Sequence, residues 1–155
     1  MEKIILICNN VQAKSASSLT IKTCDLILTS ERIICVALGA STLISGMLGG
    51  AIAGPSGAIA FSLDIINATN KESQKNSSKK IDQLLKNKDN YYVSYTDINK
   101  DKSTFKTGFF STLGMWAPLT IYDNTDKRFF FNIPNKQAKE VKKTLASITD
   151  AIILK

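Results

Sequence analysis

The stretch Ile33–Leu63, IICVALGASTLISGMLGGAIAGPSGAIAFSL, constrains how the rest of the chain can be arranged. It carries no charged side chain over 31 residues, and it holds six of the chain's eight glycines. Such a segment is typical neither of a surface loop nor of an ordinary amphipathic helix. We therefore expect it to lie in lipid or in a protein interior.

Its glycines and one alanine form two rows in which every fourth residue is small. The rows are Gly46, Gly50 and Gly54, and Gly49, Ala53 and Gly57. Residues four apart share one face of a helix, so each row makes a groove into which a second backbone can fit closely. Because each glycine costs ~1 kcal/mol in a helix relative to alanine, such rows indicate helix packed on helix.

A break lies near the middle of the stretch, at Gly54-Pro55-Ser56-Gly57. Proline removes a helical hydrogen bond and is favoured in the first turn of a helix. The sequence therefore predicts two helices, at about 38–53 and 55–70, joined by a tight bend. Lys71–Asn87 continues as a polar and basic linker with a short helix, in which Ile81, Leu84 and Leu85 share one face.

The composition of the whole chain limits the kind of protein it can be. At 155 residues, with 44% apolar and 21% charged residues, it fits one folded domain, 1–155. It contains no histidine, no Gly-Lys-Ser/Thr phosphate loop and no GxGxxG motif. We therefore expect no metal site, no cofactor and no catalytic site, and hence not an enzyme.

The cysteines and the N-terminus indicate a cytoplasmic setting. Cys8, Cys24 and Cys35 are odd in number and not in CxxC spacing, as expected of reduced, buried side chains. The apolar run Ile4–Cys8 is too short for a signal peptide and lacks a small-residue cleavage site. We therefore expect a protein at the cytoplasmic face of a membrane, with a soluble cytoplasmic protein as the alternative.

A net charge of +7 indicates an anionic partner, either a membrane surface or nucleic acid. The membrane is favoured because the densest basic stretch follows the uncharged segment directly, where each cation contributes ~1 kcal/mol of attraction to anionic headgroups. The residues predicted to contact anionic lipid are Lys22, Arg32, Lys71, Lys75, Lys79 and Lys80. The alternative is that the lysines after the segment only solubilise a linker. Nucleic acid is disfavoured, because the tyrosines at 91, 92 and 95 fit cross-strand positions of a sheet better than a stacking surface.

Short β-branched and aromatic runs predict strands on both sides of the uncharged segment. Before it we expect strands at 4–8 and 19–22 and a hairpin within 24–36, with a loop at 9–18. After it we expect strands at 91–95 and 104–110, an ambiguous loop at 113–118, and a hairpin of 119–122 with 129–133.

The C-terminal part shows the clearest helical pattern in the chain. From a cap at Asn135, apolar residues follow at Ala138, Val141, Leu145, Ile148 and Ile152, with lysines on the other faces. About seven strands and one amphipathic helix predict an α+β fold: a bent antiparallel sheet or partly open barrel, capped by the C-terminal helix.

Two motifs resemble the bacterial pleckstrin-homology-like (PH-like) and GRAM domains. Leu26–Ile34, LILTSERII, is similar to the family's hairpin, and Tyr95-Thr96-Asp97-Ile98 is similar to the end of one of its strands. The resemblance implies a seven-stranded bent sheet with a C-terminal helix, and recognition of lipids or proteins without catalysis. The chain departs from the family by an insertion at 38–87. It also lacks a cluster of Lys and Arg in the first hairpin, where a phosphoinositide-binding member would carry it.

The insertion sets a condition on membrane topology. If the strands on its two sides pair in one sheet, both lie on the same side of a bilayer and a single crossing is excluded. Each half measures about 18–24 Å as a helix, short of the ~30 Å hydrocarbon core, which favours a hairpin that dips in and returns. We therefore expect a membrane-associated recognition module anchored by this glycine-rich hairpin. The alternative is a soluble homo-oligomer in which the hairpin is the subunit contact.

Overall fold

The computed structural model describes residues 2–15, 17, 20–37, 81–108 and 114–155. The predicted helical hairpin with Gly46, Gly49, Gly50, Gly54, Pro55 and Gly57 lies outside these residues, as do Lys71, Lys75, Lys79 and Lys80. The chain divides into two compact units, each described here by itself. The first unit comprises Met1–Asn9 and Asp25–Tyr92, and the second comprises Asn10–Cys24 and Val93–Lys155.

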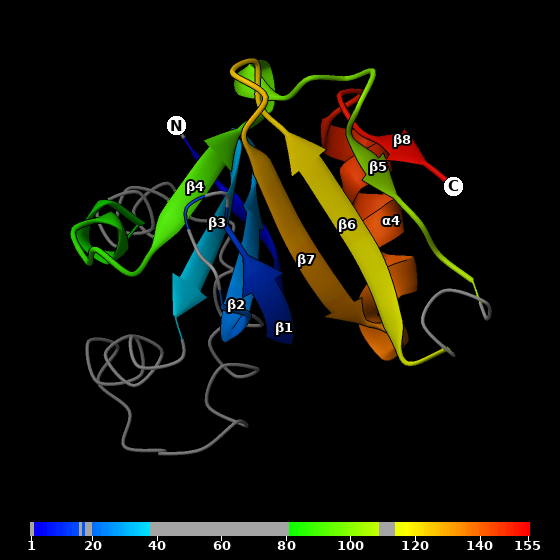
Figure 1. The fold of residues 1–155 in the computed structure, drawn as a ribbon, viewed down its shortest axis with the longest axis horizontal. Coiled ribbons are helices and arrows are strands. Elements are labelled where there is room, and N and C mark those ends of the chain that lie inside the picture. Colours follow the sequence, from blue (N-terminus) through cyan, green and yellow to red (C-terminus); the bar gives the residue numbers. More distant parts are fainter. Residues whose placement is uncertain (1, 16, 18–19, 38–80, 109–113) are drawn as a thin grey trace. The chain divides into compact units, whose positions relative to one another are not determined.

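Strands are the commonest regular element of the described chain (Figure 1). The strands are β1 (Ile4–Lys14), β2 (Lys22–Thr29), β3 (Arg32–Ala37), β4 (Tyr91–Ser94), β5 (Thr104–Phe105), β6 (Trp116–Tyr122), β7 (Arg128–Pro134) and β8 (Ile153–Leu154). The described helices are a short helix at 81–85, the 3-10 helix η1 (Tyr95–Asp97) and the α-helix α4 (Asn135–Ile148). This confirms the mainly β fold with one C-terminal α-helix.

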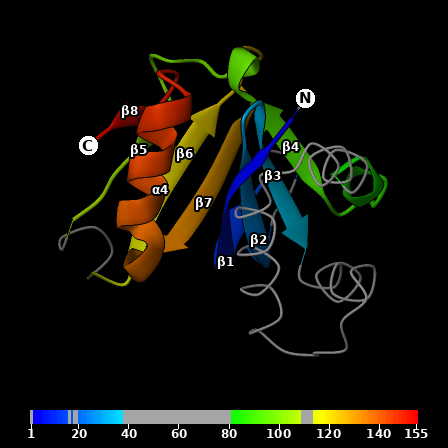
Figure 2. The same cartoon turned by 180° about the vertical axis from the view of Figure 1, so that it is seen from behind.

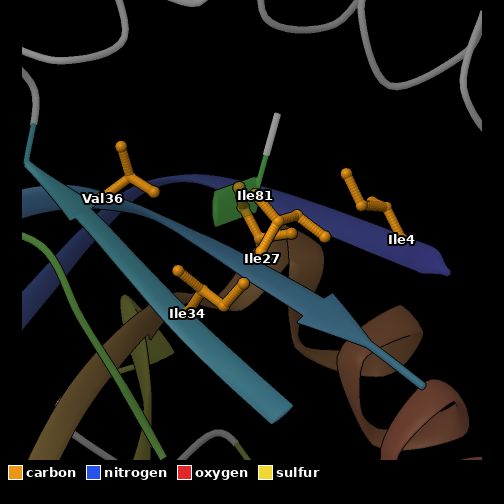
Figure 3. Close-up of a cluster of buried hydrophobic side chains, with 5 residues drawn as sticks. All are labelled: Ile4, Ile27, Ile34, Val36 and Ile81. Atoms are coloured by element: carbon orange, nitrogen blue, oxygen red, sulfur yellow. The ribbon is translucent and has the colours of Figure 1, made fainter. Parts of the chain in front are cut away.

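The boundary between the two units falls within β1 and β2, so that 4–9 of β1 and 25–29 of β2 belong to the first unit. In this unit the strand order is β4-β3-β2-β1. The tight turn Ser30-Glu31 joins β2 to β3, as the hairpin within 24–36 predicts. The cluster Ile4, Ile27, Ile34, Val36 and Ile81 forms a buried core, shown in Figure 3. The predicted short helix is present at 81–85: Ile81 is fully buried, and Leu84 and Leu85 pack against the cluster.

In the second unit the strand order is β1-β7-β6-β5-β8. β6 and β7 form the predicted hairpin, with Trp116 opposite Pro134 and Tyr122 opposite Arg128. Figure 2 shows α4 lying along β6 and β7, both of which it contacts. Its buried face consists of Ala138, Val141 and Leu145, and each fully buried Val or Leu contributes about 1.5–3 kcal/mol.

The loop predicted at 9–18 is wrong over its first half, because β1 continues to Lys14. Buried side chains fall at Ile4, Leu6 and Cys8 and then at Val11 and Ala13, so one extra residue enters the alternation. Asn10 has φ 57°, a left-handed conformation that asparagine tolerates. The polar pair Asn9-Asn10 therefore forms an irregularity within a strand rather than its end.

Three further predictions at the C-terminal side need correction. The ambiguous loop at 113–118 is wrong for Trp116–Pro118, which belong to β6 and pair with β7. The helix ends at Ile148, and Ile152 is instead buried just before β8. β8 pairs parallel with β5, so the expected antiparallel sheet includes one parallel pair.

The start of α4 also differs from the prediction. Asn135 is its first residue and the cap position is Pro134, which makes no side-chain capping bond. The Asn135 side chain instead donates a hydrogen bond to the Gly114 carbonyl, with a distance of 3.0 Å. Among the described helices, none has the length and apolar character needed to cross a bilayer.

Candidate functional site

The described ranges hold no cluster of three or more His, Cys, Asp or Glu side chains that could bind a metal ion. Cys8, Cys24 and Cys35 are buried and form no disulfide. The notable polar features of the described chain are instead an ion-pair network in the first unit and a set of exposed lysines in the second.

Arg32, one of the predicted lipid-contacting residues, lies at the start of β3 and binds Glu2. Its Nε is 2.9 Å from Glu2 Oε1, and its Nη2 is 2.7 Å from Glu2 Oε2. Glu2 is 6% exposed, and the Thr29 hydroxyl donates a further hydrogen bond to its Oε1 over 2.6 Å. A bidentate arginine–carboxylate pair of this kind is the strong form of the interaction.

Two more groups surround the Arg32 guanidinium. Its central carbon lies 4.7 Å from the centre of the Tyr92 ring, within the range of a cation–π interaction. Asp82 Oδ1 is 3.9 Å from Nη2, but this carboxylate is largely exposed and adds little. The positive charge of Arg32 is thus already compensated, and a lipid anion would have to compete with Glu2 for it.

The pKa values of the pair follow from this geometry. Burial works to raise the pKa of Glu2, but hydrogen bonds from Arg32 and Thr29, together with the charge of Arg32, outweigh it and lower that pKa. The hydrogen bond to Glu2 raises the pKa of Arg32, so this side chain stays charged. The network therefore holds one buried carboxylate in its ionised form.

The backbone of Lys3 joins this network to the β2–β3 turn. Its amide donates to Ser30 Oγ over 3.0 Å, and its carbonyl accepts from the Ser30 amide over 2.8 Å. Lys22, another predicted lipid-contacting residue, lies at the exposed start of β2, in the part of this strand that belongs to the second unit. The structure thus assigns Lys22 and Arg32 to different units, and their role in lipid contact stays a prediction.

Positive charge is unevenly divided between the two units. The sequence of the second unit contains twelve Lys or Arg against six Asp or Glu, whereas the first unit contains eight against seven. Almost the whole excess of the chain therefore belongs to the second unit. An excess of this kind attracts anionic partners over a distance of about 8–10 Å at physiological salt.

Part of this charge forms a stripe on α4. Lys136, Lys139 and Lys143 are exposed and lie within about 60° of one another around the helix, opposite the buried Ala138 and Leu145. None of the three lysines makes a salt bridge to another described residue. The spacing of three and four between these lysines in the sequence is the signal that locates this stripe.

Other lysines of the second unit are engaged in structural contacts. Lys142 Nζ donates to Thr107 Oγ1 and to the Lys155 carbonyl, both over 3.2 Å. Lys102 Nζ is 2.7 Å from Asp126 Oδ1, and Lys100 pairs with Asp150. These hydrogen bonds raise the pKa of Lys102 and lower the pKa of Asp150. They distinguish the paired lysines from those of the α4 stripe.

No protein-family model matches the chain, and no curated protein matches it. Among solved structures, the chain is similar to the "Vps36 N-terminal PH domain", with 11% sequence identity and a TM-score of 0.42. The match covers 94% of this chain and 83% of that one. A TM-score this low assigns neither a family nor a function to the chain.

Proposed function

We propose that this protein is a non-enzymatic, PH-like recognition module that works at an anionic membrane surface, where the glycine-rich segment at 38–70 anchors it as a helical hairpin. It binds lipid or protein partners at the cytoplasmic face. The proposal rests on one geometric observation in the first unit, which concerns the two strands on either side of the segment.

β3 and β4 are neighbours in the sheet, although some fifty residues separate them in the chain. The backbone amide of Ala37, the last residue of β3, donates to Asn90 Oδ1 over 2.9 Å, just before β4 begins. Val36 and Ile81, which flank the uncharged segment and its basic linker, pack in the same buried cluster (Figure 3). The chain therefore leaves this cluster after β3 and returns to it at Ile81.

A segment whose two ends lie close together, on the same side of a bilayer, cannot make a single crossing of that bilayer. A segment that enters lipid from this cluster must come back to the same face, as a hairpin does. Since residues 38–63 carry no charged side chain, a helical hairpin that satisfies its own backbone hydrogen bonds can enter lipid without burying a charge. The basic residues that follow at 71–80 then lie near the headgroups on the same side, which favours the cytoplasmic leaflet.

Membrane fractionation of the full chain tests this proposal. We expect the protein to pellet with membranes, to resist extraction by high salt and to be released by detergent. Leu48→Asp places a charge inside the segment, at a cost of about 3 kcal/mol for insertion at a helix centre, and should release the protein into the soluble fraction. Ile21→Asp is the control, because Ile21 is already 58% exposed in the second unit.

The two sides of the segment can be tested separately. Glu31→Cys and Lys88→Cys place reactive thiols on exposed positions before and after it, while the native cysteines are buried. In sealed vesicles, a membrane-impermeant maleimide should label both positions from the same side. Labelling from opposite sides would refute the hairpin, and a soluble, compact oligomer would favour the subunit-contact alternative.

A further inference from the structure

We infer that the second unit carries its own contact surface for an anionic lipid bilayer, formed by Met115, Lys136 and Lys139 and named here the Met115 surface. The inference rests on the proposed function, because it assumes that the chain works at a membrane. It adds a second attachment that does not involve the uncharged segment.

Met115 is the most exposed of the large apolar side chains in the described chain, at 63%. Its backbone position is fixed: its carbonyl accepts a hydrogen bond from the Asn135 amide over 3.0 Å, and Asn135 Nδ2 holds the Gly114 carbonyl at the same distance. Gly114 has φ 74°, a conformation that glycine adopts without strain. The structure thus fixes a large apolar residue in water at the start of β6.

Two exposed lysines of α4 follow Asn135, the residue whose amide binds the Met115 carbonyl. Lys136 directly follows Asn135, and Lys139 lies one helical turn further along α4. Neither of these lysines makes a salt bridge to a described residue.

Helix stability does not explain the lysines at this end of α4. The first turn of α4 contains no acidic residue, and a cation there opposes the helix dipole. The one carboxylate of α4 is Glu140, which lies beyond Lys139. The start of the helix and its lysines together produce a positive potential around an exposed apolar side chain.

This combination favours a lipid bilayer over other anionic partners. A thioether side chain gains by entering the acyl region just below the headgroups, while the surrounding lysines stay at the level of the phosphates. A soluble polyanion would use the lysines but would leave Met115 in water. The occupant proposed is therefore a bilayer that contains anionic lipid.

The chain contains a native reporter for this surface. Trp116, its single tryptophan, follows Met115 directly. With vesicles of phosphatidylcholine and phosphatidylserine in which some acyl chains carry bromine, bromine should quench the emission of Trp116 in the full-length protein. With purely zwitterionic brominated vesicles, the protein should remain bound through its uncharged segment, but Trp116 should be quenched much less.

Two double variants with the same change in net charge test the surface. Lys136→Gln with Lys139→Gln should weaken docking about fivefold per lysine and reduce the quenching, whereas the membrane-bound fraction persists. Lys100→Gln with Lys127→Gln is the matched control, because these residues lie beside the β6–β7 turn at the opposite end of β6. Met115→Gln should reduce the quenching without removing any charge.

Each outcome distinguishes the two proposals. If the protein binds anionic vesicles but Trp116 is not quenched, or if both lysine pairs have the same effect, the Met115 surface is refuted and the proposed anchoring stands. If the protein binds no vesicles at all, both are refuted. If a single-stranded oligonucleotide shifts Trp116 emission and vesicles do not, the partner is nucleic acid and the inference fails.

Discussion

Arg32 Nη2 lies 2.7 Å from Glu2 Oε2, which ties the N-terminal end of the chain to the start of β3. Both side chains are mostly buried, at 19% and 7% exposed, so neither charge is fully solvated if its partner is lost. We expect Glu2→Gln to lower the free energy of unfolding by about 2–3 kcal/mol, less than for a fully buried pair because Arg32 retains some access to water. Urea unfolding followed by circular dichroism measures this loss.

A double-mutant cycle separates the ion pair from the packing. Arg32→Met should cost a similar amount, and the double variant should cost clearly less than the two single losses added together. Lys3→Gln is the control, since only the backbone of Lys3 joins this network. Additive losses in the cycle would show that the two side chains do not stabilise each other.

The same carboxylate predicts how stability depends on pH. The pKa of Glu2 is lowered from its ordinary value of 4.5, so between the two pKa values the unfolded chain binds more protons than the folded chain. The contribution is therefore fully present above pH 4.5 and is lost as the pH falls through the folded pKa. Unfolding midpoints measured from pH 6 to pH 3 should fall more steeply for the native chain than for Glu2→Gln. Identical slopes would contradict this assignment.

A turn in the second unit offers a further prediction. Asp123 Oδ1 accepts hydrogen bonds from the Thr125 amide, the Thr125 hydroxyl and the Lys127 amide, over 2.7–2.9 Å. Burial opposes ionisation of Asp123, but these bonds outweigh it and lower the pKa. Asp123→Ala should cost about 1 kcal/mol in urea unfolding, because three donors lose their acceptor at a partly exposed site. Asp123→Asn retains an acceptor and should cost less.

Sequence patterns predicted those elements that are marked by a local run or a periodic spacing of apolar residues. The β2–β3 and β6–β7 hairpins were predicted from short β-branched and aromatic runs around tight turns, and the buried face of α4 from spacings of three and four. The helix at 81–85 was predicted in the same way, from Ile81, Leu84 and Leu85. In each case the apolar residues of the element itself are enough to predict it.

The errors arise where distant residues supply the stability. Asn9 and Asn10 look like a loop, yet the strand continues because residues 12–14 pair with β7, about 120 residues away. β8 is only two residues long and exists through its parallel pairing with β5. The Glu2–Arg32 pair was not predicted either, because no local pattern links residues thirty positions apart. Pairing and burial of this kind are not visible in a single sequence.

Ile81 tests whether the helix at 81–85 is an integral part of the first unit. Its side chain is fully buried against Ile4, Ile27, Ile34 and Val36 (Figure 3). Ile81→Ala leaves a cavity in this cluster and should lower the free energy of unfolding by about 2–4 kcal/mol. The control is Asp82→Ala, at a side chain 72% exposed, which should change stability by less than about 0.5 kcal/mol. Equal effects would mean that the helix does not pack there.

Asn90 lies just before β4, and its side chain forms hydrogen bonds to Ala37, at the end of β3, and to Leu84, in the helix at 81–85. Its Oδ1 accepts from the Ala37 amide over 2.9 Å, and its Nδ2 donates to the Leu84 carbonyl over 2.8 Å. Asn90 is 8% exposed, so replacing it leaves two backbone groups with poor access to water. Asn90→Ala should therefore cost about 2–3 kcal/mol, more than the loss of one ordinary hydrogen bond.

The variant Asn90→Asp distinguishes the two bonds, because aspartate still accepts from Ala37 but can no longer donate to Leu84 when ionised. It should be less destabilising at low pH, where the protonated acid regains a donor, than at neutral pH. Hydrogen exchange at the Ala37 amide should accelerate in Asn90→Ala and much less in Asn90→Asp. If exchange at Ala37 is the same in both variants, Asn90 does not hold the end of β3 beside the start of β4. The same-side return of the uncharged segment would then rest on the pairing of those strands alone.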